Sequence, residues 1–139
     1  MYDNRYMTQV SKRKLDSKIE KELLDSLSYI IKELKTKEDV DKFLSSSLTK
    51  TERLMIAKRV LTAFLLQNNI EDQRISVTLK LTPATITRLK MWIKLNKDGF
   101  DLVFKKLAKK DKEDIAKQIL YKFLNYAVKA AFGRVPKPF

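Results

Sequence analysis

The chain has 139 residues, a net charge of +13 and 44 % hydrophobic residues, which suits one compact domain with appendages. It contains no Cys and no His, which excludes disulfides, thiol nucleophiles, the usual zinc ligands and the commonest general base near neutral pH. We find no signal-peptide pattern and no run of about 18 apolar residues that could span a membrane. The basic surplus favours a polyanionic partner, although a Lys-rich composition can also reflect codon bias.

Gly occurs only twice and Pro three times, and so few turn-forming residues predict an all-α fold. Residues 1–16 are expected to form a flexible basic arm, whose Ser11–Lys14 cluster would either contact phosphates or remain a solvated tail. Residues 17–35 predict an amphipathic helix, because apolar residues recur at three- and four-residue steps from Ile19 to Leu34. Such a stripe must be covered by another apolar surface.

A short helix is expected at 38–46 and a longer one at 49–67. The longer helix begins at a capping box, Thr49-x-x-Glu52, and ends at Asn68-Asn69, where Asn replaces the usual Gly. Its predicted buried side chains are Leu54, Ala57, Val60, Leu61, Phe64 and Leu65.

Residues 71–95 have the spacing of a helix-turn-helix. We expect a helix at 71–79, a turn at 80–82 and a second helix at 83–95, with Thr82 as its N-cap and Pro83 at its first position. The turn of such motifs usually opens with Gly, so Lys80 must accept a left-handed conformation at a cost of about 1 kcal/mol. The side chains expected to fill the small core are Ile75, Leu79, Leu81, Ile86, Leu89 and Ile93.

The second helix of this motif is predicted to read the major groove of DNA, because small residues at its start allow close approach to base edges. Thr87 offers a hydroxyl and a methyl group, and Arg88 can pair with guanine or phosphate. Residues 48–97 carry ten basic and three acidic side chains, which concentrates positive charge here. The alternative is an ordinary helical hairpin with a solvated basic face. The predicted DNA-binding residues are Arg74, Ser76, Lys80, Thr82, Pro83, Ala84, Thr85, Thr87, Arg88, Lys90, Met91 and Lys94.

A break is predicted at residues 96–99, followed by helices at 100–109 and 111–132, a stop at Gly133 and an extended basic tail. Trp92 is expected to pack against these C-terminal helices rather than to serve as a stacking platform for bases. Three roles for the C-terminal residues stay open: to extend a dimer, to cover Trp92 and Leu95, or to recruit another protein.

Two segments carry a family resemblance. Leu48–Arg53 resembles the LTPDER helix entry of Trp repressor-like proteins, and Ala84–Arg88 matches their ATITR recognition-helix motif residue for residue. The resemblance covers roughly residues 40–97. It implies a multi-helix Trp repressor-like bundle over residues 17–97, with 98–139 as a C-terminal extension. It also implies an intertwined homodimer, whose N-terminal helices wrap the partner chain and whose two recognition helices enter successive major grooves.

The resemblance further implies roles for single residues. Pro83, Ala84 and Thr87 match positions that approach bases, and Ser76 matches a phosphate contact. Arg59 and Arg88 match two arginines that sandwich L-tryptophan in tryptophan-responsive members, although both also suit phosphate contacts or surface charge. Those members need a glycine after the second arginine. Leu89 stands there instead and would fill the cavity, and overpacking a filled site costs about 1–3 kcal/mol. We therefore predict that the protein does not bind L-tryptophan.

The sequence as a whole predicts a sequence-specific transcriptional regulator, a repressor, that binds double-stranded DNA in the bacterial cytoplasm, at the nucleoid, without a cofactor or metal. One alternative is a non-specific, architectural nucleic-acid-binding protein. Another is a protein-interaction module that uses the apolar face of residues 115–131. An enzyme is not expected, because Glu52, Asp72 and Asp101 are scattered and neither a nucleophile–base set nor a phosphate-cradling Gly loop is present.

Overall fold

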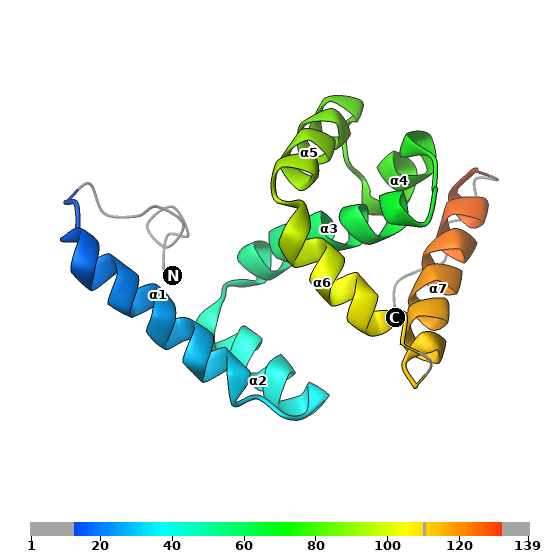
Figure 1. Cartoon of the computed structure of the whole chain (residues 1–139). Helices are drawn as coiled ribbons and strands as arrows, with labels where there is room; N and C mark the ends of the chain where they lie inside the picture. Colours follow the sequence, from blue (N-terminus) through cyan, green and yellow to red (C-terminus); the bar gives the residue numbers. More distant parts are fainter. Residues whose placement is uncertain (1–12, 110, 132–139) are drawn as a thin grey trace. The chain divides into compact units, whose positions relative to one another are not determined.

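A computed structural model describes residues 13–109 and 111–131 of the chain, with side chains as far as Tyr126. All regular structure in this part is helical (Figure 1), which confirms the all-α prediction. The helices are α1 (Ser17–Lys32), α2 (Lys37–Ser47), α3 (Lys50–Gln67), α4 (Asp72–Leu79), α5 (Pro83–Leu95), α6 (Lys97–Leu107) and α7 (Glu113–Ala131). Most of the predicted arm and the tail from Gly133 lie outside the described residues. None of the helices described is long and apolar enough to cross a membrane.

Short polar side chains set the ends of several helices. The backbone N–H of Thr49 donates to Glu52 Oε2 at 2.7 Å, and the N–H of Glu52 donates to Thr49 Oγ1 at 3.2 Å, so the predicted capping box of α3 is confirmed. Asn69 follows α3 with φ at 60°, which confirms Asn in the position that usually requires Gly. A second capping box, which we did not predict, joins Thr36 and Asp39 at the start of α2.

The predicted break at residues 96–99 was wrong in extent. Only Asn96 separates α5 from α6, and Gly99 lies inside α6. A helical Gly costs only about 1 kcal/mol relative to Ala. Phe100 and Phe104 follow on the same helix, stack with ring centroids 6.1 Å apart and pack in the core, which offsets that cost.

The structure divides into two compact units, and the first spans Met1–Met55. In this unit neither α1 nor α2 has a buried residue. The start of α3 is also open: Leu54 is 50 % exposed and Ala57 in the second unit is exposed too, contrary to our prediction for both residues. The apolar side chains of α1 that are 45–59 % exposed are Ile19, Leu23, Leu24, Leu27, Ile30 and Ile31. Within this unit, α2 therefore leaves the predicted stripe of α1 uncovered.

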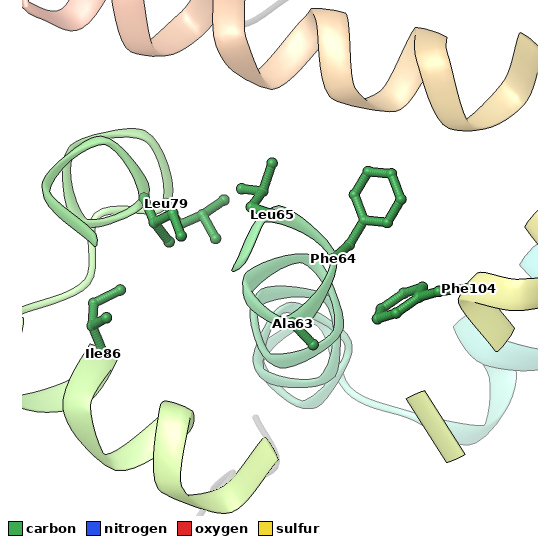
Figure 2. Packing of buried hydrophobic residues seen from close by; sticks show 7 residues of the cluster. Ala63, Phe64, Leu65, Leu79, Ile86 and Phe104 are labelled. Atoms are coloured by element: carbon green, nitrogen blue, oxygen red, sulfur yellow. The ribbon is translucent and has the colours of Figure 1, made fainter. Parts of the chain in front are cut away.

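The second unit, Ile56–Phe139, holds the buried hydrophobic core of the described residues. Figure 2 shows Phe64 and Leu65 of α3 between Leu79 and Ile86 on one side and Phe104 on the other. The rings of Phe64 and Phe104 meet edge to face with centroids 5.5 Å apart, an arrangement that aromatic pairs favour. α3 is thus the central helix of this unit, and buried side chains of α4, α5 and α6 pack around it.

α7 joins this core rather than standing apart from it. It packs beside α4 (Figure 1) and also contacts α6. Its partly buried side chains against the core are Ala116, Ile119, Leu120 and Phe123. On its exposed face, the Glu113 carboxylate lies 2.6 Å from Lys117 Nζ and raises the pKa of that ammonium group through a hydrogen bond and its charge. The C-terminal helix therefore supports the first helix of the predicted DNA-binding motif.

Candidate nucleic-acid interface

α4 and α5 enclose the small core that the sequence predicts for a helix-turn-helix. Ile75, Leu79 and Ile86 are 0 %, 9 % and 1 % exposed, which confirms the three central positions. Leu81, Leu89 and Ile93 are only half-buried. Leu89 in particular does not belong to the buried cluster, so the expectation that it is a core residue holds only in part.

The turn between the two helices is closed by Ser76. Lys80 adopts φ 52° and ψ 53°, the left-handed conformation that its position requires. Its backbone N–H and that of Leu81 both donate to the Ser76 carbonyl, the latter at 3.0 Å. The Ser76 hydroxyl in turn donates to the Leu81 carbonyl. The hydroxyl proton of Ser76 is therefore already used inside the turn. The predicted contact between Ser76 and a DNA phosphate stays a prediction, and it requires either the backbone of Ser76 or a hydroxyl that turns away from Leu81.

The first turn of α5 is held by its own threonines. Thr82 Oγ1 accepts a hydrogen bond from the Thr85 N–H at 3.2 Å and lies 2.9 Å from Thr85 Oγ1, so the predicted N-cap is confirmed. Thr87 Oγ1 donates to the Pro83 carbonyl at 3.1 Å. Pro83, Ala84 and Thr87 are exposed, and Thr85 is half-buried. The start of α5 therefore offers a small, rigid surface with the Thr87 methyl group and hydroxyl lone pairs available.

Basic side chains surround this surface. Lys90 Nζ lies 2.9 Å from Asp72 Oδ2 and so bridges α5 to α4, but both side chains are about half exposed and such pairs contribute little stability. The other predicted contacts on these helices and their turn, all exposed, are Arg74, Lys80, Arg88, Met91 and Lys94. The structure brings the predicted set onto one motif; their contact with DNA remains a prediction.

Trp92 and Arg59 form a contact that the sequence did not reveal. The guanidinium carbon of Arg59 in α3 lies 5.2 Å from the centroid of the Trp92 ring in α5, within the range of a cation–π interaction. Trp92 is 48 % exposed, so it is not a core residue, and its packing against the C-terminal helices stays a prediction. No local spacing signals this pair, because the two residues lie on helices separated by the whole of α4.

An open groove also runs beside α5, between α3 and α6. Ala63, Leu66 and Phe104 contribute to its apolar floor. Its basic rim consists of Lys90, Lys94, Lys97 and Lys105. Positive charge thus continues from the second helix of the motif onto α6.

A buried three-residue core, a left-handed turn and a capped, exposed second helix define a helix-turn-helix protein of all-α fold. Residues 22–108, well over half of the chain, match the family model described as Trp repressor protein. The chain therefore belongs to the Trp repressor family, a family of helix-turn-helix DNA-binding regulators. The match includes α6, which the resemblance at 40–97 did not reach, and it ends before α7. Comparisons with curated proteins and with solved structures gave no match.

Proposed function

We propose that this protein is a sequence-specific transcriptional repressor that reads the major groove of DNA with α5. The observation that carries the proposal is the exposed first turn of α5, where Pro83 and Ala84 are small enough to allow close approach to base edges. Thr87 and Arg88 then supply groups suited to base readout, and the exposed lysines suit phosphate contacts that fix the register.

We further propose that the protein acts as a homodimer, because the uncovered face of α1 suits a second copy of the same chain. Monomeric soluble proteins rarely expose contiguous apolar patches of this kind. Leu23 and Leu27 near the middle of the stripe are 55 % and 45 % exposed. A symmetric dimer would carry two copies of α5, which can address two half-sites about 34–36 Å apart.

We also propose that L-tryptophan does not regulate this protein. Leu89 stands where tryptophan-responsive members of the family need glycine, and Arg59, one of the two expected ligand-binding arginines, already contacts the ring of Trp92. Calorimetric titration with L-tryptophan should give no binding heat. Saturable binding in the micromolar range would overturn this part of the proposal.

Selection of genomic DNA fragments by the purified full-length protein tests the main proposal. We expect a two-fold symmetric consensus that binds at least about 10³-fold more tightly than random DNA at physiological salt. Arg88→Ala should reduce that ratio. If affinity for all sequences is equal and falls together as salt rises, the protein is a non-specific binder instead. If no DNA is retarded at low salt, the protein is neither a regulator nor a non-specific DNA-binding protein, and a protein-interaction module is favoured.

Sedimentation analysis tests the dimer. Leu27→Glu places a charge in the apolar stripe and should yield monomers at concentrations where the parent chain is dimeric. Tyr29→Glu is the matched control, since Tyr29 lies on the opposite side of the same helix and is 71 % exposed. A parent chain that sediments as a monomer, or a Leu27→Glu variant that dimerises normally, would contradict the proposal.

A further inference from the structure

We propose that Trp92 acts as an internal aromatic ligand of Arg59 and holds the recognition helix α5 against α3 without any small molecule. This inference rests on the proposed function, because it concerns the position of the helix that reads DNA. The contact joins the two helices directly, with 5.2 Å between the guanidinium carbon of Arg59 and the centroid of the indole ring.

The contact lies at the end of α5 that has few other attachments. The start of the helix is fixed by the buried Ile86 and by the cap at Thr82. Towards its end, Met91 and Leu95 are 64 % and 81 % exposed, and Ile93 is only half-buried. The indole of Trp92 therefore adds a side-chain contact at the end of α5, where Ile93 also packs against the core. A change in the tilt of this end changes how the start of the helix meets DNA.

The indole of Trp92 lies at a position that is open to solvent, where a small aromatic molecule could also bind. At 48 % exposure Trp92 is not a core residue, and the guanidinium group of Arg59 lies over its ring. Removing the side chain leaves the face of Arg59 accessible from solution, to a planar aromatic molecule of the same shape. Of the two arginines that the family resemblance assigns to the ligand, Arg59 contacts the ring of Trp92, and Arg88 lies one turn before Trp92 on the same helix.

Calorimetry with indole tests whether the vacated position is a ligand site. Full-length Trp92→Ala should bind indole saturably, whereas the parent chain and the double variant Arg59→Ala/Trp92→Ala should not. Leu95→Ala is the matched control, since it removes a large exposed side chain from the same helix and should create no site. Absence of indole binding to Trp92→Ala, or equal binding when Arg59 is also replaced, would overturn the proposal.

Fluorescence tests the contact without relying on a variant of the ring. Trp92 is the single tryptophan of the chain, so its emission reports this position alone. Arg59→Ala should shift the emission to longer wavelength and increase quenching by acrylamide, whereas Arg59→Lys, which keeps a cation, should change both less. Emission and quenching that are unchanged in Arg59→Ala would contradict the contact.

Binding to the selected DNA tests the consequence for function. A cation–π contact at an exposed site is worth about 0.5–1 kcal/mol, which corresponds to a loss of about two- to fivefold in affinity for each recognition helix in Trp92→Ala. Added indole should restore this loss. Arg59→Ala should cost a similar factor, and the double variant should be no worse than either single variant. Fully additive losses, or no effect of indole, would refute the inference. If the parent chain binds no DNA, the proposed function fails, while calorimetry and fluorescence still decide the role of Trp92.

Discussion

Replacing Lys80 by Gly should change stability and DNA binding in opposite directions. Lys80 opens the turn of the helix-turn-helix with φ 52° and ψ 53°, a conformation that costs a non-Gly residue roughly 1–2 kcal/mol. Gly removes that strain but makes the unfolded chain more flexible, at a cost of about 0.4–1 kcal/mol. At the midpoints of these two ranges the net gain is about 0.8 kcal/mol. With about 2.1 cal/mol/K of unfolding entropy per residue, this raises the Tm of a 139-residue chain by about 2–3 °C.

The same substitution removes an exposed positive charge beside α5. If Lys80 contacts a DNA phosphate, each lost contact reduces the slope of log affinity against log salt by about 0.9, or about 2 for a dimer with two motifs. Affinity at low salt should fall equally for the selected sequence and for random DNA, since phosphate contacts do not read sequence.

Two controls separate strain from charge. Lys80→Ala removes the charge but keeps a Cβ, so it should lower the salt slope by the same amount as Lys80→Gly without the gain in Tm. Asn69→Gly relaxes the other left-handed position of the described residues, at φ 60° and away from the motif, and should leave DNA binding unchanged. Melting must be compared at one protein concentration, because Tm depends on concentration in a dimer. A Lys80→Gly chain that melts below the parent would refute the strain argument.

Three further substitutions test the packing of the second unit. Ile86→Ala should lower the free energy of unfolding by about 2–5 kcal/mol in urea titration, because Ile86 is 1 % exposed at the centre of the motif; a loss below 1 kcal/mol would contradict that packing. Thr62→Val should raise the Tm by a few degrees, since Thr62 Oγ1 is buried and has no hydrogen-bond partner among the described residues; a lower Tm would indicate a partner in the native protein. Phe123→Ala should accelerate amide exchange in residues 72–79 more than in α2, and equal effects would show that α7 does not support α4.

Local patterns in the sequence predicted the helices well because each end carries its own signal. Thr49, Asn69 and Thr82 act through hydrogen bonds or dihedral angles within a few residues, so their roles can be predicted from the sequence alone. Gly99 misled us for the same reason: as a local signal it marks a break, whereas the tertiary packing of Phe104 on the same helix decides the outcome.

Such local patterns could not predict contacts between segments that are distant in the sequence. Periodicity identified Leu54 and Ala57 as one apolar face but not what covers it, and both residues are exposed in the structure. In the candidate site, the sequence identified the motif and its exposed helix but not the internal use of the Ser76 hydroxyl. It also gave no sign that Arg59 meets Trp92, because cation–π pairs between helices have no fixed spacing.

Two of the contacts that support the helix-turn-helix from outside act on different helices. α7, beyond the residues that match the family, packs on α4 through side chains such as Leu120 and Phe123. The Arg59–Trp92 contact joins α5 to α3. A ligand shifts a conformational equilibrium only by its differential affinity for the two states. If side chains of the chain itself already hold both helices in one arrangement, a small molecule has no second arrangement to select against, and occupancy of the DNA site should follow the concentration of the protein alone.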